Sequence, residues 1–116
     1  MNIQRIAPGP RMSGAVVHGN TVYLAGHVSA EPRGNVRGQT EAILMRIDER
    51  LAQAGTDRSQ LLSAQIWLTD IAKFDEMNAA WEAWIDPKNP PARATVEARL
   101  ASPDYLVEIS VIAARP

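Results

Sequence analysis

The sequence predicts an α+β fold in which two helices cover one face of a mixed or largely antiparallel β-sheet. Short segments in which apolar and polar residues alternate occur near both ends of the chain and once in the middle. Two longer segments between them carry apolar residues at helical spacing. The chain has 116 residues, so we expect a single domain spanning residues 1–116.

Three strands are predicted before the first helix. Residues 3–6 are expected to form a short strand, and the prolines and glycines that follow indicate a loop. Residues 15–18 and 21–25 are rich in β-formers and flank Gly19-Asn20, a pair that tolerates positive φ. A tight hairpin is therefore expected at this pair.

The first helix is expected from about residue 39 to residue 54. Segment 27–38 is polar and rich in turn-forming residues, which predicts a loop that leads into the helix. Apolar residues then recur every three or four positions, and Gly55 supplies a helix stop.

The middle of the chain predicts a strand followed by the second helix. In the segment "LLSAQIWLTD" apolar Leu62, Ala64, Ile66 and Leu68 alternate with more polar residues. Asp70 is expected to cap the next helix, which carries a stripe of apolar side chains and ends before a group of prolines. The stripe consists of Phe74, Met77, Trp81 and Trp84.

Two final strands are predicted in "ARATVEARL" and "YLVEISVIAA". The intervening "ASPD" is rich in turn formers, so we expect a hairpin that places Glu97 opposite Glu108. Alternation in the first of these strands separates an apolar set from a polar set, and the apolar set is expected to face the core. That set consists of Ala92, Ala94, Val96, Ala98 and Leu100.

The composition makes several functional classes improbable. The net charge is −1, and no cluster of Lys and Arg indicates a nucleic-acid partner. The absence of cysteine excludes disulfides, a thiol nucleophile and thiolate metal sites, and the two histidines stand in no metal-ligand pattern. No apolar run approaches the roughly 20 residues that span a bilayer, and no signal peptide is recognised, so a cytoplasmic protein is expected.

Arg93 and Glu108 are the first candidates for chemistry. The guanidinium of Arg93 offers a planar set of donors suited to a carboxylate; alternatively Arg93 forms an ordinary ion pair with Glu97 or Glu108. Glu108 lies between apolar neighbours and could exchange protons or orient a water, or else balance Arg93 or Arg99 across the sheet. Thr95 shares a strand face with Arg93, although threonine is also simply a favoured strand residue.

The sheet face that the helices leave open predicts self-association. Trp67, Leu106 and Ile112 are expected to share that face with polar groups. A monomer would expose them as an amphipathic patch, so we expect a homo-oligomer that packs these faces together.

Several segments together resemble the RidA (YjgF) family over nearly the whole chain. They are "PPARATVEARL" followed by "VEISVIAA", together with "TVYLAGHV", "AGTDRSQLLSAQIWLTDI" and "FDEMNAAWEAW". The specific part is the P-A-R-x-x-V-E pattern with a glutamate fifteen residues after its arginine. The resemblance implies a fold like that of chorismate mutase from bacilli and a homotrimer with a central sheet-lined barrel and three clefts between subunits.

The resemblance also implies an activity and a set of site residues. Members of the archetypal group hydrolyse reactive 2-imino acids and their enamine tautomers to 2-keto acids and ammonia, without a cofactor or metal. By motif match, Arg93 would clamp the substrate carboxylate, Glu108 would hold the hydrolytic water, and Gly26 and Thr95 would complete the polar wall. The alternative is a non-catalytic protein of the same family that binds a carboxylate metabolite and regulates or protects a partner.

Three positions depart from the archetype. Ala25 replaces a serine, Thr95 replaces a cysteine, and the segment "GPRMSG" lacks a tyrosine found in the archetypal proteins. These differences lie around the implied pocket. RNA cleavage, proposed for some relatives, fits poorly with the slightly acidic balance of charge.

Overall fold

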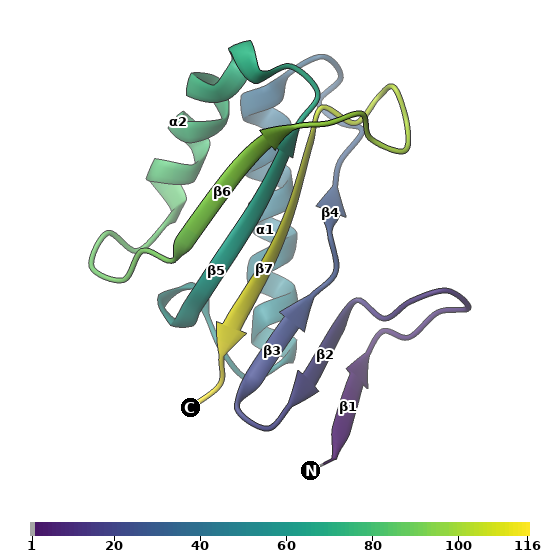
Figure 1. Ribbon diagram of the computed structural model, residues 1–116, viewed down its shortest axis with the longest axis vertical. Coiled ribbons are helices and arrows are strands. Elements are labelled where there is room, and N and C mark those ends of the chain that lie inside the picture. Colours follow the sequence, from purple (N-terminus) through teal and green to yellow (C-terminus); the bar gives the residue numbers. More distant parts are fainter. Residues whose placement is uncertain (1) are drawn as a thin grey trace.

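The computed structural model describes residues 2–116 as one mixed β-sheet with two α-helices (Figure 1). Two 3-10 turns, η1 (Arg58–Gln60) and η2 (Ile71–Lys73), lie beside strand β5. The strands are β1 (Ile3–Ile6), β2 (Ala15–His18), β3 (Thr21–Leu24), β4 (His27–Val28), β5 (Leu61–Leu68), β6 (Ala92–Glu97) and β7 (Val107–Ala114), and the helices are α1 (Val36–Gln53) and α2 (Phe74–Trp84).

The order of strands across the sheet is β1-β2-β3-β7-β5-β6, and the short β4 also pairs with β7. Strands β5 and β6 run parallel, whereas the other pairs are antiparallel. The predicted hairpin is confirmed, because His18 pairs with Thr21 across Gly19-Asn20. Gly19 has a φ of 61°, a conformation that glycine adopts without steric cost.

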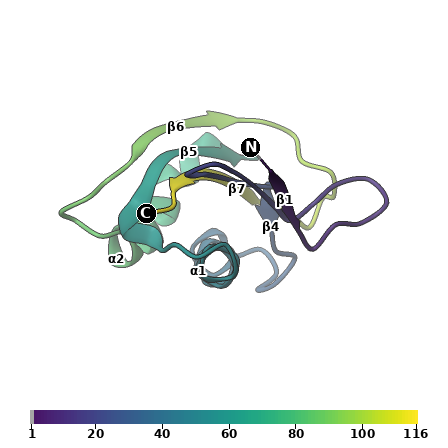
Figure 2. The same cartoon turned by 90° about the horizontal axis from the view of Figure 1, so that it is seen from below.

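Both helices lie on the same face of the sheet, as predicted (Figure 2). The core between them and the sheet includes fully buried Ile43 and Ile47 from α1, Ile66 from β5 and Ile109 from β7. Helix α1 begins earlier than expected because the Asn35 side chain accepts a hydrogen bond from the Gly38 amide at 2.8 Å. Within residues 2–116, neither helix is long and apolar enough to cross a membrane.

A polar cluster joins the two helices. The Asp48 carboxylate of α1 accepts hydrogen bonds from the Arg58 guanidinium at 2.9 Å and from the Trp84 indole at 3.0 Å. Arg58 also donates to the Trp84 carbonyl at 2.6 Å and stacks over its ring. This cluster holds the end of α2 against α1.

The prediction that the last two strands form a hairpin is wrong. Strand β5 lies between β6 and β7, so Glu97 pairs with Leu68 and Glu108 pairs with Trp67. The chain between β6 and β7 therefore crosses over the end of β5 instead of turning back sharply. A turn-rich sequence indicates a change of direction, but it does not specify which strand becomes the neighbour.

The predicted orientation of β6 is also wrong. Arg93 and Thr95 are paired with Ala64 and Ile66, whose side chains are buried, and paired residues project from the same face of a sheet. The polar side chains of β6 therefore face the helices. Ala92, Ala94 and Val96 face outward instead, and Val96 is 45% exposed on the open face. Ala98 and Leu100 lie beyond the end of the strand.

Three smaller expectations need correction. Residues 27–28, expected in a loop, form strand β4, and Asp70 caps the 3-10 turn η2 through the Ala72 amide instead of capping α2. A β-bulge between Leu61 and Ser63 turns Leu62 outward to 50% exposure, and Leu61 is buried in its place. Leu106 packs against the core and not on the open face.

Candidate functional site

Arg93 lies near the start of the edge strand β6, on the side of the sheet that bears the helices. Its guanidinium carbon is 5.7 Å from the centre of the Phe74 ring and 5.3 Å from the centre of the Trp81 ring, both on α2. Burial lowers the pKa of this guanidinium, an effect partly opposed by the negative charge of Glu82. Aromatic faces attract a cation and also exclude water from it. Arg93 is therefore a positioned, partly desolvated cation.

Arg93 forms none of the ion pairs found within residues 2–116. The proposed pairing with Glu97 or Glu108 is absent from this part of the chain, and the Glu97 carboxylate instead accepts a hydrogen bond from the Ile71 amide at 3.0 Å. A guanidinium that is held against aromatic rings without a carboxylate partner can receive one from a ligand.

Thr95 follows Arg93 on the same face of β6 and carries an unpartnered hydroxyl. Its Oγ1 atom is buried and has no hydrogen-bond partner among the residues that the structure describes. Buried polar atoms are normally satisfied, and leaving one unpaired costs about 1 to 3 kcal/mol. An unpartnered hydroxyl and an unpaired arginine therefore lie on the same face of β6.

Glu108 and Gly26 lie together on the opposite, open face of the sheet. Glu108 is half-buried on β7, and its register partners are Trp67 and Val28. A Cβ atom placed on Gly26 would lie 2.9 Å from the Glu108 carboxyl carbon and closer still to its Oε2 atom. Gly26 therefore leaves room for the carboxylate to lie directly against the backbone between β3 and β4.

The four residues predicted for the site form two half-sites on opposite faces of the same sheet. Arg93 and Thr95 constitute the half-site facing α2, and Gly26 and Glu108 constitute the half-site on the open face. Alternate residues of a strand point to opposite faces, so the sheet itself separates the two sets. One copy of the chain cannot bring the Arg93 guanidinium and the Glu108 carboxylate to a common small ligand.

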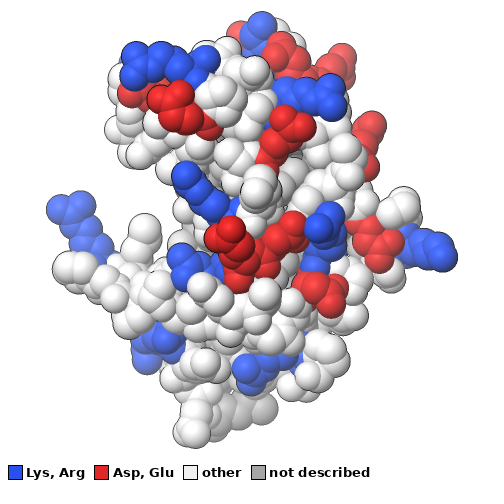
Figure 3. Space-filling view, turned by 180° about the vertical axis from the view of Figure 1, so that it is seen from behind, with Lys and Arg blue, Asp and Glu red and all other residues white. Residues whose placement is uncertain are grey.

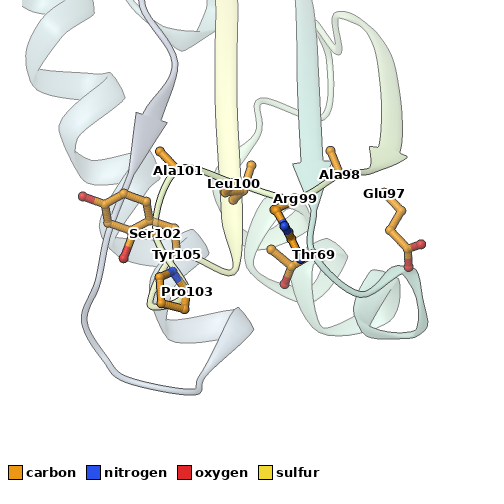
Figure 4. A pocket seen from close by; sticks show the side chains of 9 residues that line it. All are labelled: Thr69, Glu97, Ala98, Arg99, Leu100, Ala101, Ser102, Pro103 and Tyr105. Atoms are coloured by element: carbon orange, nitrogen blue, oxygen red, sulfur yellow. The ribbon is translucent and has the colours of Figure 1, made fainter.

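Two surface cavities lie beside β6. A pocket of about 610 Å³ lies where the segment after β6 crosses toward β7, and Figure 4 shows Thr69, Arg99 and Tyr105 among its lining residues. It contains neither Arg93 nor Glu108. A second pocket, of about 430 Å³, lies over β5, β6 and β7. Its lining includes Ser63, Gln65 and Ile112, which are on the open face, so that face is hollowed. Arg93 also contributes to this lining, at the edge strand β6.

Phe74 and Trp81, which the sequence analysis assigned only to an apolar stripe of the second helix, contact the Arg93 guanidinium. Trp81 is buried and Phe74 is 37% exposed, and the Arg93 guanidinium lies over both rings. The signal in the sequence was an aromatic stripe on a helix that precedes a strand carrying an arginine. The Ser110 hydroxyl, on the open face of β7, donates to the Leu24 carbonyl at 3.0 Å.

Comparison with known proteins identifies the family. The family described as "Endoribonuclease L-PSP" matches residues 2–115. A RutC family protein of Haemophilus influenzae is 45% identical over 114 residues, covering 97% of this chain and 98% of that protein. The RutC family protein YoaB of Escherichia coli is 40% identical over 114 residues, covering 98% and 99% of the two chains.

The structural comparison agrees with the sequence comparison. The crystal structure of a YjgF family member from Neisseria meningitidis superposes with a TM-score of 0.96 at 40% identity, covering 100% of this chain and 97% of that one. The architecture is therefore that of the YjgF-type α+β proteins. The chain belongs to the Endoribonuclease L-PSP family, which is the YjgF/RidA family.

Proposed function

We propose that the protein hydrolyses small reactive 2-imino acids to 2-keto acids and ammonia in a cleft between two copies of the chain. The observation that carries this proposal is Arg93, a partly desolvated guanidinium held over two aromatic rings without a carboxylate partner in residues 2–116. An α-imino carboxylate supplies the missing anion, and the guanidinium binds it in bidentate fashion. The unpartnered Thr95 hydroxyl lies on the same strand face and gives the ligand a second polar contact.

A second copy of the chain completes this site in the proposal. Glu108 and Gly26 of one copy meet Arg93 and Thr95 of the next. Residues that the sheet keeps apart within one chain thus come together between two chains. The open sheet face supports this assembly, because it exposes Tyr23 and Val96 and is hollowed over β5, β6 and β7. In the homotrimer implied by the family resemblance, these open faces line a central barrel, as in the chorismate mutase of bacilli.

The proposed chemistry needs water and a base but no cofactor. Glu108 accepts a proton from a water molecule as the oxygen attacks the imine carbon, and the imine nitrogen is protonated. The resulting carbinolamine then loses ammonia as its hydroxyl becomes the keto oxygen. The net reaction consumes one water and releases one 2-keto acid and one ammonia. Because an imine is already electrophilic, the protein contributes mainly orientation and proton transfer.

The family description names an endoribonuclease, but the charge distribution favours a small acid over RNA. Figure 3 shows basic and acidic side chains interspersed over the helix-bearing face, and the net charge of the chain is −1. Proteins that grip a phosphate backbone gather Lys and Arg into a continuous basic surface. Arg93 instead presents one cation beside aromatic rings, an arrangement matched to a single carboxylate.

The test generates imines with an amino-acid oxidase and follows their disappearance. We expect the wild-type protein to shorten the lifetime of the imine, and Arg93→Ala to lose this effect. Arg37→Ala is the matched control, because Arg37 is an exposed arginine whose ion pair within residues 2–116 is with Glu41, one helical turn away. Equal rates for wild type and Arg93→Ala would refute the assignment.

Two further measurements separate the alternatives. A protein that only binds carboxylate metabolites would show thermal stabilisation by 2-keto acids with no effect on imine lifetime. Analytical ultracentrifugation tests the shared cleft, since a protein that remains monomeric at micromolar concentration cannot form it.

A further inference from the structure

A separate polar pocket lies between β4 and helix α1, on the helix-bearing side of the sheet. Its volume is about 240 Å³, and it is lined by His27, Arg46, Glu49, Arg50 and Gln53. His27 pairs with Ile109, whose side chain is buried under the helices, whereas Glu108 points to the open face. This pocket is therefore on the other side of the sheet from the Glu108 half-site.

The two arginines of this pocket are held in place but keep most of their donors free. Arg46 donates to the Val28 carbonyl at 2.6 Å, and Arg50 donates to the Gln53 side-chain oxygen at 2.9 Å. Each of these bonds uses one nitrogen of a guanidinium that carries five N–H donors. Neither arginine belongs to an ion pair within residues 2–116.

The position of Arg50 depends on a glycine in a neighbouring loop. A Cβ atom placed on Gly14 would lie 2.7 Å from the Arg50 guanidinium carbon, so the guanidinium packs directly against the Gly14 backbone. Arg46 and Arg50 are four residues apart on one helix face, where two like charges repel each other. The helix dipole favours a cation at Arg50 in the last turn, but this effect fades by Arg46.

His27 is a third polar side chain that lines the same pocket. Its Nδ1 lies 2.8 Å from the Ala25 carbonyl, which can only accept, so this nitrogen carries the hydrogen and Nε2 remains available. Burial, together with the charges of Arg50 and Arg46, lowers the pKa of the imidazole. The charged groups around the pocket are thus two arginines and one carboxylate, Glu49.

We propose that His27, Arg46 and Arg50 form a binding site for the phosphate group of a small metabolite. Three donors that come from a strand and from two turns of a helix suit a tetrahedral oxyanion better than a planar carboxylate. A dianion also matches the charge of the two guanidinium groups, and the Glu49 carboxylate opposes its binding by repulsion. A bound dianion favours the imidazolium form, so Nε2 of His27 then donates a third hydrogen bond.

The test uses inorganic phosphate as the probe and the His27 imidazole resonances as the reporter. Near neutral pH we expect a saturable shift of these resonances with phosphate at constant ionic strength. Arg46→Gln and Arg50→Gln should each weaken binding about tenfold, since a charged hydrogen bond is lost. Glu49→Gln should strengthen binding, because it removes the carboxylate that lines the pocket, and the control Arg37→Gln should leave it unchanged.

A pH titration provides a second measurement, the pKa of His27. An anion would not change this pKa if the three side chains had a purely structural role. With sulfate, which stays dianionic throughout, the pKa of His27 should rise relative to chloride at equal ionic strength. The proposal is overturned if no saturable shift occurs up to about 10 mM phosphate. It is also overturned if acetate binds as tightly as phosphate, or if Arg37→Gln weakens binding as much as Arg50→Gln. Circular dichroism of each folded variant separates lost binding from lost structure.

Discussion

Replacing Gly26 by alanine should impair the proposed reaction while leaving the fold nearly unchanged. The new Cβ atom would lie 2.9 Å from the Glu108 carboxyl carbon and closer to Oε2, whereas real Cβ contacts stay beyond 3.0 Å. Relieving the overlap with the oxygen moves the carboxylate by about 1 Å, a displacement that can lower a catalytic rate roughly hundredfold. That factor corresponds to about 2.7 kcal/mol of transition-state stabilisation.

The stability of this variant should change little because the atoms that must move are the end of a flexible side chain. Gly26 is exposed and does not adopt a positive φ, so alanine introduces no backbone strain. We expect the midpoint of thermal unfolding to shift by less than about 4 °C. Gly9→Ala is the matched control, since a Cβ there meets only the Met12 carbonyl at 3.5 Å, an ordinary contact.

The assay compares imine lifetimes in the presence of wild type, Gly26→Ala and Gly9→Ala at equal concentrations of folded protein. Wild-type turnover by Gly26→Ala would refute the placement of Glu108 in the reaction. A parallel loss in Gly9→Ala would show that the assay reports a general effect of adding a methyl group to a loop.

Three further predictions concern stability and pH. Thr95→Val should raise the free energy of unfolding by about 1 kcal/mol, because it removes a buried hydroxyl that has no partner among the described residues. The same change should weaken the binding of 2-keto acids. A decrease in stability measured by urea unfolding would contradict the burial argument. Asp48→Ala should lower the free energy of unfolding by about 2 kcal/mol, since the Trp84 indole and one nitrogen of Arg58 each lose an acceptor. Urea unfolding that matches wild type would show that this carboxylate contributes nothing to stability. His27 has a folded-state pKa below its ordinary value of 6.5, chiefly because of burial, so its contribution to stability is present above pH 6.5 and is lost as the pH falls below that value. His27→Gln should therefore flatten the pH dependence of stability just below pH 6.5, and an unchanged slope would contradict this reasoning.

The local periodicities of the sequence predicted most of the core correctly. Ile43, Ile47 and Leu51 recur at helical spacing, and all three are buried on α1. The apolar positions of β7 alternate with half-buried ones, as the strand pattern indicated. These predictions succeed because side-chain direction in a helix or strand depends on the backbone geometry of neighbouring residues alone.

The β6 strand shows where such reasoning stops. Its alternation correctly separates Arg93 and Thr95 from the apolar positions, but period alone does not say which set faces the helices. The register with β5 decides that, since Ala64 and Ile66 are buried and carry their β6 partners to the same side. An apolar outward face on an edge strand fits the expectation of self-association.

The sequence by itself determined the α+β class, the number and nature of the helices, the Gly19-Asn20 hairpin and, through family resemblance, Arg93 and Glu108 as the residues to consider. Only the tertiary structure decided that β5 lies between β6 and β7, which places Arg93 and Glu108 on opposite faces of one sheet. The physical reason is that strand pairing joins segments far apart in the chain, and the hydrogen bonds and burial that select the partner do not depend on sequence distance.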